Sequence, residues 1–134
     1  MPNSPRVFDS WPIFAFLNDE PTAGEVQSLL REGRETGRPM WITAVNLGEI
    51  WYGVARRTSF EAAEQTVERV RRLGLEVVNA DWTLTRLAAQ FKARYRLSYA
   101  DCFAAALAKQ HAVEVVTGDP EFRQLEKEVK IRWL

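Results

Sequence analysis

Cysteine and histidine are almost absent from this sequence, which has one of each, Cys102 and His111. A single cysteine cannot close a disulfide within the chain, and zinc sites need several cysteine or histidine ligands. Cys102 lies in an alanine-rich segment, so we interpret it as a small packed residue without a chemical role. The sequence therefore excludes a disulfide scaffold and argues against a zinc site.

Long apolar runs and net charge are also missing. No run approaches the roughly 18 residues that a membrane span needs, and the first residues lack the basic and then apolar pattern of a secretion signal. From 134 residues with a formal net charge of zero, we expect a single domain over 1–134, cytoplasmic and without membrane contact. Neutrality is unfavourable for binding a polyphosphate, but fourteen of the eighteen cationic residues are arginines, which suit phosphate contacts.

Short apolar runs alternate with helical patterns along the chain. We predict helices at 10–17, 23–35, 43–57, 60–73, 82–95 and 98–110 and a short one after 120, between strands at 6–9, 40–42, 76–78, 114–117 and 129–133. Ser10 is expected to cap the first helix, and helices 60–73 and 82–95 to pack as neighbours. Strands separated by helices pair in parallel through right-handed crossovers, which predicts a three-layer α/β/α sandwich with a central, mainly parallel sheet.

Four acidic residues fall at positions that such a sheet brings together. Asp9 and Asp119 follow predicted strands, and the carboxyl ends of parallel strands form the crevice where α/β proteins bind ligands. Glu49 lies off the apolar stripe of its helix, and Asp101 lies in a first helical turn ahead of small alanines that allow close approach to the sheet. The sequence therefore predicts that Asp9, Glu49, Asp101 and Asp119 converge.

Converging carboxylates repel one another unless cations occupy the site. Oxygen ligands favour Mg²⁺ or Mn²⁺, which lower the pKa of water and assist hydrolysis of a phosphodiester. Each acid alone is equally well explained as a helix cap, a turn residue or a solvated side chain, so the prediction depends on their joint placement. Ser10 and Thr117, which adjoin the strand-end acids, are either ordinary caps or hydrogen-bond partners of a ligand carboxylate.

The acidic segments resemble a known family. Val7 to Ser10, Ile42 to Gly53, Leu97 to Ala106 and Val116 to Phe122 are together similar to the PIN-domain ribonucleases, specifically the VapC-type toxins of toxin–antitoxin pairs. The resemblance covers nearly the whole chain and places the family's acids on Asp9, Glu49, Asp101 and Asp119. It implies Mg²⁺- or Mn²⁺-dependent endonucleolytic cleavage of RNA, a homodimer, and a cognate antitoxin protein that blocks the cleft.

Two features accompany this resemblance. Glu121 stands where family members carry a further acid, as a peripheral or water-mediated ligand or as a solvated acid in a first helical turn. Trp11-Pro12 departs from the small residues expected after the first acid and alters the cleft wall or the start of the helix.

Four arginines are candidate phosphate contacts for the RNA. Arg56 and Arg57 end the helix that bears Glu49, and Arg94 and Arg96 precede Asp101. Arginines at helix C-termini are also ordinary partners of the helix dipole. The apolar stripes of helices 23–35 and 60–73 are core by default, although part of their surface is suited to receive an antitoxin helix.

Two other interpretations stay open at this point. In the first, the domain is catalytically silent and serves as a protein-interaction module. In the second, Asp9 takes a phosphate as in aspartyl-phosphate enzymes, but Asp9-Ser-Trp lacks a second acid at the spacing such an enzyme uses. Metal binding without RNA cleavage would favour the first.

Overall fold

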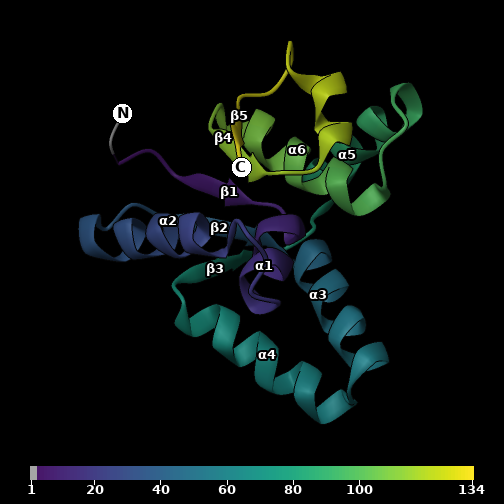
Figure 1. Cartoon of the computed structure of the whole chain (residues 1–134). Coiled ribbons are helices and arrows are strands. Elements are labelled where there is room, and N and C mark those ends of the chain that lie inside the picture. The colour runs from purple at the N-terminus through teal and green to yellow at the C-terminus, as the bar shows by residue number, and fades with distance from the viewer. Residues whose placement is uncertain (1–2) are drawn as a thin grey trace.

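A computed structural model describes residues 3–134, which form a parallel five-stranded sheet between two layers of helices (Figure 1). In chain order the elements are β1 (Arg6–Phe8), α1 (Ser10–Leu17), α2 (Ala23–Thr36), β2 (Met40–Thr43), α3 (Ala44–Arg57), α4 (Phe60–Arg72), β3 (Leu75–Val78), α5 (Trp82–Arg94), α6 (Tyr99–His111), β4 (Glu114–Thr117), the 3₁₀ helix η1 (Pro120–Leu125) and β5 (Ile131–Trp133). Among these described elements, no helix has the length and apolar character needed to span a membrane.

The strands lie in the order β3-β2-β1-β4-β5, and all neighbouring pairs are parallel. This confirms the predicted three-layer α/β/α fold. The chain first builds the sheet outward from β1 to β3 and then returns to the other side of β1 to add β4 and β5. The strand order therefore reverses between β1 and β4. Sheets of this kind bind ligands in a crevice at the carboxyl ends of the two strands where the order reverses.

Each strand buries alternate side chains on opposite faces of the sheet. Val7 and Val115 pack with α5 and α6, whereas Phe8 and Val116 pack with the helices of the other layer. This alternation follows from the two-residue period of a strand, and it explains the short, continuously apolar runs seen in the sequence. Both faces of the central strands are thus covered, as Figure 1 shows, with α5 and α6 on one side and α1 to α4 on the other.

The expectation that helices 60–73 and 82–95 pack as neighbours was wrong. In the structure α4 packs against α3, and α5 packs against α6 on the opposite face of the sheet. The physical reason is the handedness of the crossovers. Because the chain reverses direction across the sheet after β3, a right-handed connection to β4 must pass over the other face.

Polar side chains at the helix starts set where the helices begin. Thr43, Asp81 and Ser98 each accept a hydrogen bond from a backbone N–H three residues ahead, as expected of N-caps. The prediction for Ser10 was wrong, because Asp9 occupies the N-cap position of α1 and Ser10 is already helical. The Ser10 hydroxyl is instead available to the side chain of Glu49, to which it donates a hydrogen bond.

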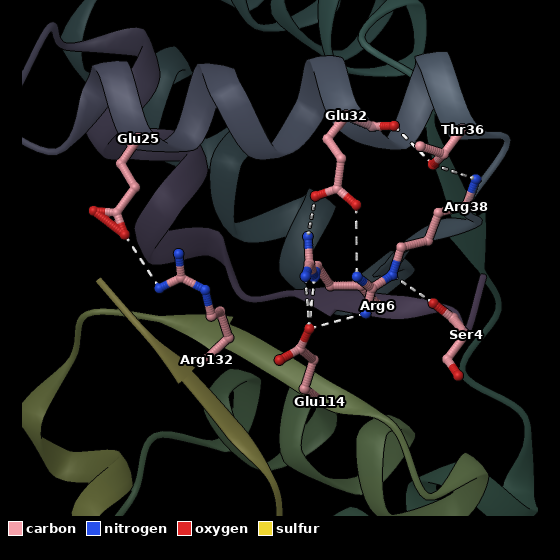
Figure 2. A network of polar contacts seen from close by, with 8 residues as sticks. All are labelled: Ser4, Arg6, Glu25, Glu32, Thr36, Arg38, Glu114 and Arg132. Carbon is pink, nitrogen blue, oxygen red and sulfur yellow. Dashed lines mark hydrogen bonds and ion pairs between the residues drawn. The ribbon is translucent and has the colours of Figure 1, made fainter. Parts of the chain in front are cut away.

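A network of ion pairs closes the opposite end of the sheet (Figure 2). Glu114, at the start of β4, accepts from Arg6 over 2.8 Å and from Arg38 over 2.9 Å, and Arg6 also pairs with Glu32 of α2 over 3.3 Å. Arg6 is 6% exposed, so these partners compensate the cost of burying its charge. The network joins the amino-terminal ends of β1 and β4 and is separated by the strands from the acidic end.

Candidate active site

The carboxyl ends of β1 and β4 hold the centre of the acidic cluster. Asp9 directly follows β1 and is fully buried, and its backbone N–H donates to the Val116 carbonyl over 3.1 Å. The Thr117 hydroxyl donates to Asp9 Oδ2 over 3.0 Å and accepts from the backbone N–H of Asp119 over 3.1 Å. The two strand-end acids are therefore connected through one hydroxyl.

Two further carboxylates, those of Asp101 and Glu121, gather beside this pair. Asp101 is placed by the first turn of α6, where its backbone N–H donates to the Ser98 hydroxyl over 3.1 Å. Carboxylate oxygens of Asp101, Asp119 and Glu121 all lie within 4.8 Å of one another. Glu121, which the sequence suggested as a peripheral ligand, lies inside this three-carboxylate group, because the turn into η1 lets its backbone N–H bond to Asp119 Oδ1 over 2.9 Å.

Glu49 reaches the cluster from α3. Its carboxylate accepts the hydrogen bond from Ser10, which fixes it beside the start of α1. It is not a member of the three-carboxylate group, but its charge acts on both Asp9 and Asp101. The structure thus brings together all four acids that the sequence singled out, with Glu121 as a fifth.

Two carboxyl groups of the site, those of Asp9 and Asp101, have raised pKa values because they are buried and lie beside other negative charges. Burial, the charge of Asp101 and the charge of Glu49 raise the pKa of Asp9 well above its ordinary value. Burial and the neighbouring charge of Asp119 raise the pKa of Asp101 from 3.8 to about 6. Buried carboxylates with raised pKa values at the mouth of a sheet are typical of a site that a cation completes.

A comparison with known protein families identifies the domain. A profile of the PIN domain matches residues 6–128. The chain belongs to the PIN-domain family. No match was found among curated proteins.

Several solved structures share the architecture of this PIN domain. DNA-bound VapBC of Salmonella typhimurium matches with a TM-score of 0.71 and 24% identity, over 95% of this chain and 96% of that one. VapBC2 of Rickettsia felis, bound to a promoter DNA fragment, matches with a TM-score of 0.72 and 13% identity over 97% and 98%. The Mycobacterium tuberculosis toxin VapC20, described as cleaving the sarcin–ricin loop, matches with a TM-score of 0.70 and 18% identity over 95% and 98%.

Sequence reasoning missed one residue of the site, Asn46. It is fully buried on α3, its side-chain N–H donates to the Ala100 carbonyl over 3.1 Å, and it lies 3.5 Å from Asp9 Oδ1. Asn46 thus joins α3 to the start of α6 behind Asp9. A signal was present in the sequence, because Asn46 precedes the buried Ile50 by four residues and so lies on the apolar stripe of the helix.

Four arginines of this PIN domain were singled out for phosphate contacts, and their surroundings differ. Arg94 is paired with Glu128 over 3.1 Å, and Arg56 lies 5.0 Å from the centre of the Tyr52 ring. Arg57 lines a pocket at the end of α3, and the main chain of Arg96 bonds to the side chain of Gln124. Their contacts with RNA stay predictions.

Neither Cys102 nor His111 offers an alternative catalytic centre. Cys102 is buried in α6, and burial raises the pKa of its thiol to about 11, which keeps it protonated and unreactive at neutral pH. The His111 ring packs edge-on against Trp41 with 4.8 Å between ring centres. The acidic cluster therefore remains the candidate site of this PIN domain.

Proposed function

We propose that this protein is a metal-dependent endoribonuclease that acts as the toxin of a toxin–antitoxin pair. The single observation that carries the proposal is the gathering of Asp9, Glu49, Asp101, Asp119 and Glu121 at the carboxyl edge of a PIN-domain sheet. A structural role does not account for it, since like charges gathered around the buried Asp9 and Asp101 destabilise a fold unless a ligand offsets the repulsion.

The donor set fits a hard divalent cation. All five groups are carboxylates, and three of them, Asp101, Asp119 and Glu121, have oxygens close enough to share one ion. Oxygen-only coordination favours Mg²⁺ or Mn²⁺ over zinc or copper. Such an ion, when bound, lowers the pKa of water and offsets negative charge on a phosphodiester.

The surrounding residues hold the carboxylates in fixed orientations. Thr117 and Asn46 contact the two oxygens of Asp9, and Ser10 donates to Glu49. Because these hydrogen bonds form within the folded chain, the carboxylates need little reorganisation when substrate arrives, which is how a preorganised site lowers a barrier. In this proposal Ser10, Thr117 and Asn46 are positioning residues.

The substrate and partners follow from the same reasoning. RNA is favoured because one structural relative, VapC20, is described as cleaving the sarcin–ricin loop, and an antitoxin is favoured because several others are VapBC complexes. Of the four candidate arginines, Arg56, Arg57 and Arg96 are the proposed phosphate contacts, whereas Arg94 is already paired with Glu128. We propose that the protein works as a homodimer in the cytoplasm, where RNA and antitoxin are both present.

Cleavage of a panel of structured RNAs by the purified, antitoxin-free protein tests the proposal. We expect cleavage with Mg²⁺ or Mn²⁺, none with EDTA, and none by Asp101→Asn. Glu126→Gln, which removes an exposed carboxylate outside the cluster, is the matched control and should cleave normally. Metal binding by calorimetry without cleavage of any RNA would instead favour the silent interaction module.

A further inference from the structure

Helix α1 carries two aromatic side chains that are each seated on a glycine. The tip of the Trp11 indole would lie 2.4 Å from a Cβ on Gly118, and the tip of the Phe14 ring would lie 2.9 Å from a Cβ on Gly53. A Cβ at either glycine would therefore push the ring out of its present position. Because Trp11 and Phe14 are three residues apart in a helix, their side chains project from neighbouring positions on one side of α1.

These two rings form walls of a pocket of about 410 Å³. The pocket lies between α1 and the segment that leads into α2, and its lining consists of Trp11, Phe14, Ala15, Glu20, Pro21 and Thr22. Its volume falls in the range of about 300–1,000 Å³ that is usual for small-molecule sites.

Both walls are anchored next to the acidic cluster. Gly118, under Trp11, directly precedes Asp119, and Gly53, under Phe14, follows Glu49 by one turn of α3. Trp11 itself is two residues after Asp9. The two rings therefore lie between the pocket and the segments that carry Asp119 and Glu49.

The lining decides which part of a substrate the pocket accepts. Within the described lining, Glu20 is the one charged residue, and its negative charge repels phosphate. The Thr22 hydroxyl oxygen is covered by the protein itself, so Glu20 is the polar group that the lining offers to an occupant. Aromatic walls and a carboxylate acceptor together suit a flat, uncharged ring with N–H donors, which is the chemistry of a nucleobase.

We propose that this pocket binds a nucleobase of the RNA next to the phosphate held at the acidic cluster, and that Trp11 is the residue on which this base stacks. The inference rests on the proposed ribonuclease function and adds a determinant of which RNA is bound. Glu20 supplies the polar contact, and the seating of the indole on Gly118, which directly precedes Asp119, places the stacked base beside the segment that carries this acid.

A nitrogen-15 NMR titration of the 134-residue protein in Mg²⁺ tests the pocket. Of the five indole N–H signals, the one missing in Trp11→Phe belongs to Trp11. We expect GMP, whose base edge has two adjacent N–H donors, to shift this signal and the Thr22 amide. Ribose 5-phosphate, which shares the phosphate and sugar but has no base, should leave both unmoved at the same concentration.

Variants separate stacking from a general effect on the fold. Trp11→Leu keeps apolar bulk against Gly118 but cannot stack, so we expect GMP to bind about tenfold more weakly. Trp11→Phe keeps an aromatic ring and should retain most of the affinity, read from the Thr22 amide. Trp82→Leu is the matched control, because Trp82 is 73% exposed and lies outside the lining of this pocket.

The pocket and the ribonuclease function can fail separately. If GMP leaves the Trp11 signal unmoved, or if ribose 5-phosphate shifts it equally, the pocket proposal is overturned even when the protein cleaves RNA. Equal GMP affinity in Trp11→Leu and wild type would overturn it as well. If no RNA is cleaved while GMP shifts Trp11 and the Leu variant loses affinity, nucleobase binding stands and the nuclease proposal fails.

Discussion

The Thr117 hydroxyl donates a hydrogen bond to the Asp9 carboxylate although the two residues lie 108 positions apart in the chain. The sheet register causes this contact, because Phe8 pairs with Val116 on adjacent parallel strands and the next residue of each lies beside the other. Asp9 therefore has its orientation fixed by backbone pairing as well as by its own side chain. The same hydroxyl accepts from the Asp119 N–H, so one threonine orders both strand-end acids.

Replacing this threonine by valine tests its positioning role. Thr117→Val keeps the side-chain shape and removes the hydroxyl, so the fold should survive. Its hydrogen bond lowers the pKa of Asp9, and without it Asp9 should be harder to ionise and less well oriented. We expect Mg²⁺ or Mn²⁺ affinity to fall about 10- to 100-fold, measured by calorimetry.

Thr36→Val is the matched control for this prediction. The Thr36 hydroxyl is exposed at the end of α2 and donates to the Glu32 carbonyl, beside the ion pairs that lie at the opposite end of the sheet from the acids (Figure 2). Its metal affinity should equal that of the wild type. Unchanged affinity in Thr117→Val, with an intact fold by circular dichroism, would contradict the positioning role.

The raised pKa of Asp101 makes the stability of the metal-free protein depend on pH. The value is about 6 in the folded chain and near 3.8 when unfolded, so between these values the folded state binds more protons. The stabilisation is complete below pH 3.8 and is lost as pH rises through 6, by about 3 kcal/mol. Urea unfolding in EDTA at a series of pH values measures it.

Asp101→Asn isolates this effect from other titrating groups. The variant cannot ionise at this position, so its free energy of unfolding should exceed that of the wild type increasingly from pH 4 to pH 6 and stay higher above that. Saturating Mn²⁺ should stabilise the wild type much more than the variant. If the free energy of unfolding changes with pH in the same way in the two proteins, the pKa of Asp101 is not raised in the folded chain and the prediction is wrong.

Much of the site was predictable because it depends on local rules. The strand-end positions of Asp9 and Asp119 follow from apolar runs that stop at an acid, and Asp101 follows from the capping pattern that begins at Ser98. Glu49 follows from helical phase, since the buried Leu47 and Ile50 define the opposite stripe. These signals lie within a few residues of each acid.

The features that the sequence left open or missed depend on the exact local geometry of a turn or on contacts between distant segments. Glu121 enters the carboxylate group because the chain turns into a 3₁₀ helix after Asp119, and the sequence does not distinguish this from an ordinary helical turn. The seating of Trp11 on Gly118 joins segments more than 100 residues apart. Local periodicity carries no information about such contacts, nor about which face of the sheet α5 covers.

The ion pairs at the opposite end of the sheet should contribute stability without affecting catalysis. Glu114→Gln removes the charge that Arg6 and Arg38 share and leaves two largely buried guanidinium groups with fewer partners. We expect the free energy of unfolding to fall by about 2 kcal/mol, measured with urea at neutral pH. RNA cleavage per folded molecule should not change.

A second ion pair provides the control for this variant. Glu25 pairs with Arg132 over 3.1 Å, but both side chains are more than a third exposed. Exposed pairs typically contribute less than about 1 kcal/mol, so Glu25→Gln should change stability little. An equal loss in the two variants would mean that burial of the Glu114 network has no special importance, and reduced cleavage in folded Glu114→Gln would connect this end of the sheet to the site.

Two of the candidate RNA-contacting arginines should behave differently, because one is already paired. Arg94 is bound to Glu128, whose pKa is lowered to about 2 by hydrogen bonds from Lys109, Tyr95 and Arg94, whereas Arg57 lines an open pocket with Arg69. A guanidinium without an acidic partner gains more from a phosphate. Arg57→Gln should therefore weaken RNA binding and reduce the slope of log affinity against log salt by about 1.

The matched variant Arg94→Gln should leave that salt slope nearly unchanged and lower stability modestly instead, since the loss falls on its partner Glu128. Both slopes are measured in protein made inactive by Asp101→Asn, so that a cleavable RNA stays intact. Fluorescence anisotropy gives the RNA affinity from about 50 to about 300 mM KCl, a range over which phosphate contacts change the affinity strongly. If Arg94→Gln changes the slope as much as Arg57→Gln, the RNA displaces Glu128 from Arg94, and the phosphate path runs past α5 as well as α3.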